Sequence, residues 1–359
     1  MTRTPSFGEP APMEGAGAYN RRSGVQAASL RVPLSMLEHA AATVPLPGQP
    51  APVVIADYGA SSGHNSLAPM KAAVSSLRQR CGADRAISVV HTDLPGNDFA
   101  VLFQTLADDP ESYMKGDEAV FASAVGRSFY GQILPSCSVT LGWSSWAVQW
   151  LSHAPAQIPD HVQVAYSNDP AARAAFARLA KEDWHAFLLS RGKELCPGGR
   201  LVIVTMACSD DGDFGHRGVL EAMQSGLRQL TSEGLLRPAE VRQMAIPTFG
   251  RTQREFVEPF TAQERFGGLS LERIEMFEGD DRIWSQFERD GDASLFGASW
   301  AAFSRASVFP TLALGLADGR NDPRAPVFMD RLEAVMAAQL ARKPGPTFIP
   351  LAGLVLVKA

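Results

Sequence analysis

The sequence predicts an α/β protein built on a doubly wound sheet, and three stretches of the chain support this fold class. The apolar run 53–57 is followed by a glycine-bearing loop and then by apolar residues at helical spacing over 67–77. A second apolar run, 86–91, comes after this helix, so the order is strand, loop, helix, parallel strand. Further along, a helical pattern over 171–195 leads into the buried strand 200–206, which is how such a sheet continues.

The remaining elements follow from apolar periodicity and from the positions of proline and glycine. The C-terminal helical region is expected to break at Pro310 and over 318–326. The expected elements are helices over 23–42, 99–106 and 252–266, strands over 119–125, 138–143, 269–277 and 350–357, an irregular helical region over 209–246 and a mostly helical region over 285–340.

Composition excludes several classes of protein. The chain has 359 residues, 45% hydrophobic and 20% charged, which is enough to bury a large core in one elaborated domain or two. Its net charge of −5 argues against nucleic-acid binding, which needs clustered Lys and Arg. No apolar run is long enough to span a membrane. Four cysteines without a C-x-x-C pair are typical of reduced core thiols in a cytoplasmic protein.

The glycine loop after the first strand is the first candidate binding site. Gly59 and Gly63 allow a sharp turn and a close approach to a ligand, and Asp57 ends the strand at the edge where open α/β sheets bind ligands. A dinucleotide fingerprint would place a glycine at Ala60 or Ser61, and neither is one. The loop therefore suits a nucleoside that carries an amino-acid group, although an ordinary strand–helix turn would have the same pattern.

Two residues on neighbouring segments extend this candidate site. Asp93 ends the second strand, where a carboxylate can accept hydrogen bonds from both hydroxyls of a ribose. The alternative is an Asp that caps the turn before Pro95. Phe129 lies in a loop and offers a ring on which adenine could stack, and the alternative is a core Phe.

Three of the six tryptophans lie within eight residues. Trp143, Trp146 and Trp150 are spaced i, i+3, i+7, which on a helix would place them on one face. An aromatic core stripe is one interpretation. The other is a flat apolar slot for a substrate, with indole N–H groups as donors.

Several motifs in order resemble the SABATH methyltransferases, the salicylate, benzoate and theobromine type that use S-adenosylmethionine. Residues 55–65 (IADYGASSGHN) resemble the family's I-A-D-L-G-C-S-S-G-P-N, and residues 93–99 match its D-L-P-G-N-D-F. Residues 128–131 match its S-F-Y-G, and residues 144–152 keep both ends of its S-S-Y-x-x-x-W-L-S. The matches run from about residue 13 to residue 205, and such a series is far more specific than one glycine loop.

The resemblance implies a Rossmann-like sheet with a helical cap over its carboxyl edge, often in a homodimer. It places S-adenosylmethionine at the glycine loop and the substrate beside the tryptophans. Counting Asp57 from the strand pattern, the expected cofactor residues are Tyr19, Asp57, Gly59, Ala60, Asn65, Asp93, Leu94, Ser128 and Phe129. The expected substrate residues are Gln26, Trp143, Trp146, Gln149 and Trp150, of which Gln26 and Trp150 match the pair that holds the substrate carboxylate.

The chain departs from the family at several of these positions. Ala60 replaces a cysteine, which a backbone contact would tolerate, and Trp146 stands where family members have Tyr. Gln149 stands where family members commonly have Met or His. Trp143 stands where they commonly have His. Some members carry D-x-F-N before Ile-Pro with a proposed metal contact, but residues 242–245 read RQMA here, so we expect no metal.

These patterns give an expected division of the chain. It comprises a disordered N-terminus over 1–12, a cofactor-binding methyltransferase core over 13–210, a mainly helical cap over 211–248 and 285–345, and returns to the core sheet over 249–284 and 346–359.

The function expected from the resemblance is methylation of the carboxylate of a small aromatic or conjugated acid, with no general base and no catalytic acid–base residue. Methylation of a nitrogen on a purine-like heterocycle is the alternative within the family. From other classes, a nicotinamide-dependent oxidoreductase is disfavoured by the missing glycine fingerprint. An inactive module that retains the cofactor site stays open because Trp146 and Gln149 depart from the family pattern.

Overall fold

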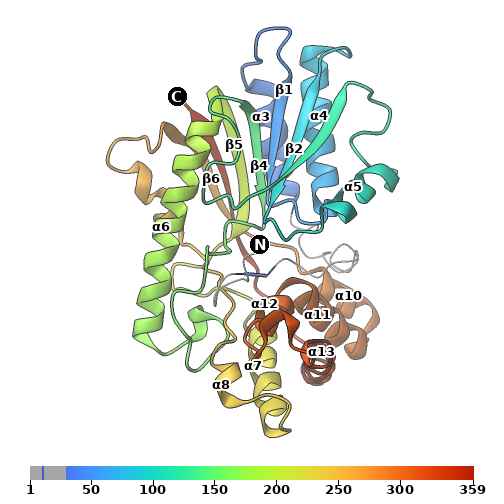
Figure 1. Ribbon diagram of the computed structural model, residues 1–359, viewed down its shortest axis with the longest axis vertical. Helices are drawn as coiled ribbons and strands as arrows, with labels where there is room; N and C mark the ends of the chain where they lie inside the picture. The colour runs from blue at the N-terminus through green and yellow to red at the C-terminus, as the bar shows by residue number, and fades with distance from the viewer. Residues whose placement is uncertain (1–9, 12–29) are drawn as a thin grey trace.

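The computed structural model describes residues 10, 11 and 30–359 of the chain. Seven strands form one sheet in the order β3-β2-β1-β4-β5-β7-β6, seen edge to edge in Figure 1. The first five strands pair in parallel, whereas β7 runs antiparallel between β5 and β6. The predicted doubly wound α/β fold is confirmed, and the last strand makes the sheet mixed.

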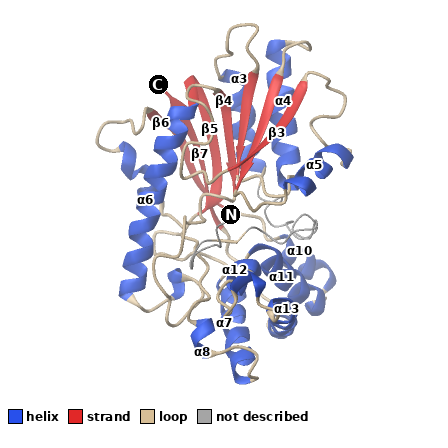
Figure 2. Ribbon diagram, in the orientation of Figure 1, coloured by secondary structure: helices blue, strands red, loops and turns tan. Residues whose placement is uncertain are grey.

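Helices and strands mostly alternate along the first half of the chain, and helices dominate the second half. In chain order the helices and strands are α3 (Arg31–Thr43), β1 (Val53–Tyr58), α4 (Leu67–Cys81), β2 (Ile87–Asp93), α5 (Phe99–Asp108), β3 (Val120–Gly126), β4 (Val139–Ser145), α6 (Pro170–Glu194), β5 (Leu195–Met206), α7 (Arg217–Ser232), α8 (Pro238–Val241), α9 (Gln253–Val257), β6 (Leu269–Glu278), α10 (Arg282–Asp290), α11 (Ala293–Ser307), α12 (Phe309–Ala313), α13 (Ala325–Arg342) and β7 (Pro350–Lys358). Figure 2 shows the strands gathered in one sheet, with the helices α7, α11, α12 and α13 together below it.

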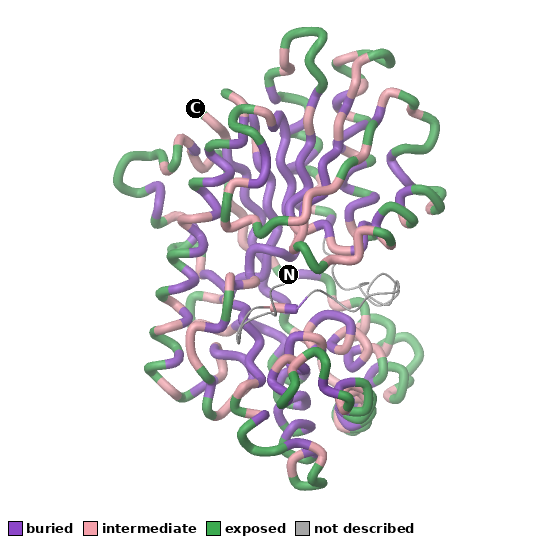
Figure 3. Tube along the Cα trace, viewed as in Figure 1, coloured by how far each residue is buried: buried purple, intermediate pink, exposed green. Residues whose placement is uncertain are grey.

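The central strands of the sheet are buried on both faces, as Figure 3 shows. Successive side chains of a strand point to opposite faces, so Ile55 packs with α3 and α4 while Ala56 packs with Trp184 and Phe187 of α6. This explains why β1 is apolar throughout rather than alternating. The edge strands are less covered, and Phe121 of β3 is 57% exposed.

The helical cap lies against the carboxyl edge of the sheet and has its own core (Figure 1). Helices α7, α11 and α13 pack around Trp300, Phe309 and Phe328, which are fully buried. Pro310 and Pro326 lie in the first turns of α12 and α13, so the expected interruptions are confirmed, with each proline beginning a helix. The cap is built from segments that flank β6 in the chain, and β6 and β7 complete the sheet beneath it.

Two local expectations are wrong, and one conditional arrangement does not occur. Trp143, Trp146 and Trp150 do not share a helix, because Trp143 lies on β4, in agreement with the strand expected over 138–143, and Trp146 has a left-handed backbone with φ of 54°. The helix expected over 252–266 is limited to α9 and one short 3₁₀ turn, Glu258–Phe260. The strand expected over 200–206 begins earlier, because β5 starts at Leu195 directly after α6.

The disorder expected over residues 1–12 stays a prediction. Tyr19 and Gln26 lie outside the described residues, as does most of that segment. Ala11 is described and buried, and its amide donates a hydrogen bond to Thr311 Oγ1 at 3.0 Å. All four cysteines are free, but only Cys208 is buried, so the others are not core thiols. In the part of the chain that is described, no helix has the length and apolarity to cross a membrane.

Candidate functional site

The loop after β1 is fastened to the end of β2. The amides of Gly59 and Ala60 both donate to Thr92 O, at 2.9 and 3.0 Å. Gly59 has φ of 89°, a conformation that favours glycine, and a Cβ there would come within 2.5 Å of Ala147 Cβ. The glycine therefore serves both the turn and a close contact with the segment that follows β4.

Asp93 lies at the carboxyl end of β2 and is bound from two sides. Its Oδ2 accepts from the Ser61 amide and its Oδ1 from the Leu94 amide, both at 2.7 Å. Desolvation raises the pKa of Asp93 to about 6, against the lowering effect of these hydrogen bonds. A carboxylate has about four lone-pair sites, so two remain for further donors such as the two hydroxyls of a ribose. The residues present thus fit a nucleoside group at this position.

Asp57 was expected to contact the cofactor, which stays a prediction, and its side chain is buried in a hydrogen-bond network. It is 2% exposed, and its Oδ2 accepts from Ser66 Oγ at 2.5 Å and contacts His91 Nδ1 at 2.8 Å. The other ring nitrogen of His91 lies 2.7 Å from the hydroxyl of Tyr113. This buried network ties the loop and the following helix to β2 from inside.

The 128–131 loop borders the glycine loop from the other side. Phe129 is half-buried, packs edge-on against Phe187 at 5.6 Å, and lies 3.9 Å from where a Cβ of Gly59 would be. Arg191, paired in the core with Glu194 at 2.8 Å, donates to the carbonyl of Phe129 at 2.7 Å. The ring is thus packed in the core and also lies near the glycine loop, and its stacking on adenine stays a prediction.

The expected cofactor residues within the described chain gather at the carboxyl ends of β1, β2 and β3. Ser128 is exposed, whereas Asn65 and Leu94 are half-buried. Their contact with a cofactor stays a prediction.

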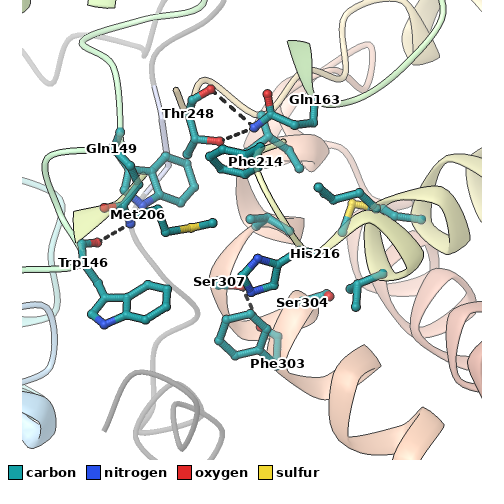
Figure 4. A pocket seen from close by; sticks show the side chains of 16 residues that line it. Trp146, Gln149, Gln163, Met206, Phe214, His216, Thr248, Phe303, Ser304 and Ser307 are labelled. Carbon is teal, nitrogen blue, oxygen red and sulfur yellow. Dashed lines mark hydrogen bonds between the residues drawn. The ribbon is translucent and has the colours of Figure 1, made fainter. Parts of the chain in front are cut away.

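A cavity lies between the segment after β4 and the cap (Figure 4). Its volume of about 80 Å³ is several times the ~10–15 Å³ that one water molecule needs. Trp146, Gln149 and Trp150 line it, as the sequence predicts for a substrate site. Trp143 does not line it, because this side chain is 1% exposed and packs under the sheet with Ile55. The expected substrate role of Trp143 is therefore not supported by its position.

No pattern in the sequence indicated the other cavity walls. These come from β5, from the loops around residues 163, 214 and 248, and from the cap helices, where irregular helical patterns carry no functional signal. The additional lining residues are Gln163, Met206, Phe214, His216, Val219, Leu220, Met223, Ile246, Thr248, Phe303, Ser304, Ser307 and Val308.

Most polar side-chain groups on the side of the cavity that faces the sheet already have hydrogen-bond partners within the protein. The Gln149 amide donates to Trp146 O at 2.6 Å and accepts from Thr205 Oγ1 at 2.8 Å. Gln163 donates to Thr248 Oγ1 at 2.6 Å. The indole N–H of Trp146 is buried without a hydrogen-bond partner among the described residues.

The walls that the described residues contribute to the cavity carry no charge. None of the described residues that line it is Asp, Glu, Lys or Arg, and burial lowers the pKa of its one histidine, His216, to about 4. Within the described chain, no three His, Cys, Asp or Glu side chains gather as a metal site would require. The expectation that no metal is bound stays a prediction.

Comparison with known proteins agrees with this architecture. The family model described as SAM dependent carboxyl methyltransferase matches residues 11–343. The solved structure of a loganic acid methyltransferase with S-adenosylhomocysteine superposes with a TM-score of 0.74 at 21% identity, covering 97% of this chain and 98% of that one. That likeness concerns the fold, and it confirms the methyltransferase type of sheet with its cap.

Sequence relatives include proteins with different acceptors. Methyltransferase LUC1 from a Fusarium species is 30% identical over 250 residues, which is 68% of this chain and 65% of that protein. Salicylate carboxymethyltransferase from Clarkia breweri is 28% identical, over 67% of each chain. A 3,7-dimethylxanthine N-methyltransferase from Camellia sinensis is 26% identical, over 72% of each. With its model matched from residue 11 to residue 343, the chain belongs to the family of SAM-dependent carboxyl methyltransferases.

Proposed function

We propose that this protein transfers the methyl group of S-adenosylmethionine to the carboxylate of a small, flat acid, aromatic or conjugated, and so forms a methyl ester. The observation that carries the proposal is the neutral cavity walled by Trp146 and Trp150, next to the glycine loop. Ala147, between these tryptophans, is the residue that Gly59 closely approaches. The cavity and the proposed cofactor loop are therefore adjacent.

Methyl transfer to a carboxylate requires the protein mainly to position the two reactants. The bound methyl donor supplies an electrophilic methyl group. A carboxylic acid with a pKa of roughly 4 is already ionised at neutral pH, so no side chain needs to remove a proton. The chain has to hold the acceptor oxygen in line, with reacting atoms about 3–3.5 Å apart, and exclude water. Trp146, Met206 and Phe214 form apolar walls suited to that task.

The neutrality of the cavity favours reaction over tight binding of the acid. A carboxylate loses its charge as the ester forms, and only interactions that strengthen toward the transition state accelerate the step. A buried arginine would stabilise the charged acid most strongly before reaction. The unpartnered indole N–H of Trp146 and the indole of Trp150 are uncharged donors that hold the acid with less of this ground-state stabilisation.

Methylation of a purine-like nitrogen is the second candidate. It is supported by the Camellia relative and by the same neutral cavity, which would admit an uncharged heterocycle. Mass spectrometry of the product separates a methyl ester from an N-methyl product.

A thermal-shift comparison of S-adenosylhomocysteine with NAD tests the more distant oxidoreductase alternative. The homodimer suggested by the family is a further proposal, which light scattering of the purified protein tests.

The test of the main proposal uses labelled S-adenosylmethionine with a panel of carboxylic acids. Gln26→Ala and Trp150→Ala should lower methyl transfer at least tenfold while S-adenosylhomocysteine binds nearly as in the parent. Leu189→Ala, at a side chain 44% exposed on α6, is the control and should change neither quantity. Equal loss of transfer and cofactor binding in the first two variants would contradict the assignment.

A further inference from the structure

His216 is the histidine that lines the cavity from the cap side. It precedes α7 with φ of 55°, a backbone conformation uncommon for residues other than glycine, and its amide donates to Phe348 O at 3.0 Å. The side chain is 6% exposed, and its Nδ1 is buried with no hydrogen-bond partner among the described residues. An unpartnered buried polar group of this kind is unusual in a folded protein and calls for an explanation.

The imidazole is held in one place by aromatic neighbours. Trp300 meets it edge-on with ring centres 5.7 Å apart, and Phe303 lies nearly parallel to it at 6.5 Å. The carbonyl of the preceding Gly215 accepts from Tyr166 Oη at 2.7 Å. Figure 4 shows the ring standing in the cavity on the side opposite Trp146. The aromatic neighbours therefore hold the ring in one orientation at the cavity wall.

Two serines of α11 lie on the same wall and present oxygen acceptors. Ser304 Oγ donates its proton to Trp300 O at 2.9 Å, and Ser307 Oγ donates to Phe303 O at 2.7 Å. Each hydroxyl has one proton, so both oxygens can only accept hydrogen bonds from a molecule in the cavity. Together they supply acceptors next to the histidine.

The histidine itself is uncharged at neutral pH. Burial lowers its pKa to about 4, and its place at the start of a helix also disfavours a positive charge. A neutral imidazole offers one N–H donor and one nitrogen acceptor. The wall therefore combines one donor with several acceptors inside an otherwise apolar cavity.

We propose that His216 is a specificity-determining residue that recognises a hydroxyl group on the end of the substrate remote from the reacting carboxylate. This inference rests on the proposed carboxyl methylation and names its substrate class as hydroxylated aromatic or conjugated acids. A hydroxyl accepts from the imidazole N–H while it donates to Ser304 or Ser307. A carbonyl or ring nitrogen would leave the serine oxygens unused, and a plain ring would leave the histidine unpartnered as well.

The position of His216 suits this role. Trp146, Gln149 and Trp150 form the wall that adjoins the glycine loop, whereas His216 and α11 belong to the cap. An acid that directs its carboxylate toward the tryptophans would direct its far end toward the histidine. Recognition there would change which acid is accepted without touching the methyl donor.

The experiment measures kcat/KM for two matched pairs of acids, benzoate with 4-hydroxybenzoate and cinnamate with 4-hydroxycinnamate. We expect the protein to prefer the hydroxylated member of at least one pair by about tenfold. His216→Phe should abolish this preference by lowering kcat/KM for the hydroxylated acid about tenfold, with less than a twofold change for the plain acid. His216→Asn keeps a donor and an acceptor and tolerates the left-handed backbone, so it should retain part of the preference.

Met223→Leu is the matched control, because it alters an apolar side chain of the cap that lines the same cavity and should affect both members of a pair alike. Equal preference for plain and hydroxylated acids in the parent, or equal losses for both in His216→Phe, would overturn the inference and leave carboxyl methylation intact. If S-adenosylhomocysteine binds but no acid is methylated, the proposed function fails and this inference fails with it. Thermal unfolding of each variant verifies that it is folded.

Discussion

Replacing Gly59 with alanine should damage the glycine loop through two separable effects. The residue has φ of 89°, and a left-handed conformation costs an L residue about 1–2 kcal/mol. The added Cβ would also lie 2.5 Å from Ala147 Cβ, far inside normal contact, and overpacking of this kind costs about 1–3 kcal/mol. Gly59→Ala should therefore lower the free energy of unfolding by about 2–5 kcal/mol, measured by urea denaturation.

Two further variants separate strain from crowding. Gly234→Ala has a similar φ of 79° and nothing within 4 Å of its new Cβ, so it should lose only the strain of about 1–2 kcal/mol. Adding Ala147→Gly to Gly59→Ala removes the crowding atom. In a double-mutant cycle the two changes should show a favourable coupling of about 1–3 kcal/mol.

The same variants report on function, because the crowded contact joins the proposed cofactor loop to the cavity wall. Gly59→Ala should weaken binding of S-adenosylhomocysteine in calorimetry, and the double variant should recover part of it. A coupling near zero, or a Gly59→Ala protein no less stable than Gly234→Ala, would refute the reasoning about the close approach.

Other predictions concern the remaining parts of the site. Burial raises the pKa of Asp93 to about 6, so the proposed ribose acceptor is ionised above pH 6, and binding of S-adenosylhomocysteine should weaken as the pH falls through 6. Asp93→Asn should bind the ligand about tenfold more weakly at pH 8 and lose this pH dependence, and a persisting dependence would assign it to another group. Arg191→Met leaves Glu194 buried and unpaired, which should cost about 3–5 kcal/mol in urea denaturation, and it releases the Phe129 carbonyl, so cofactor affinity should also fall. Arg200→Met, at a more exposed ion pair, should cost about 0–1 kcal/mol, and similar losses in both variants would show that burial of the pair is not the reason.

The fold could be predicted because its signals are local. The apolar runs that became β1, β2 and β5 are buried on both faces, and such strands are continuous in the sequence. The proposed cofactor loop was found for the same reason, since Gly59 needs its left-handed φ and a strand end precedes it.

Other features depend on contacts between segments that are distant in the sequence, so local sequence patterns could not predict them. Asp57 at a strand end suggested a ligand contact, and the contact of its carboxylate with His91, 34 residues later, was not indicated. The spacing of Trp143 and Trp146 suited a helix, yet strand pairing with β5 placed the first in the core and a left-handed turn placed the second in the cavity. His216 carried no signal, because its proposed role depends on serines of helix α11, some 80 residues away along the chain.

The residues proposed to bind the methyl donor and most residues of the cavity wall come from different parts of the chain, and this separation has an evolutionary consequence. The described residues proposed for the methyl donor all precede Tyr130, whereas much of the cavity wall comes from residues after Met206. Mutations in the later part can accumulate while the earlier part stays under constraint from a single shared ligand. A lineage built in this way can exchange one acceptor for another by small steps, and relatives named for salicylate and for dimethylxanthine are what such drift would leave behind.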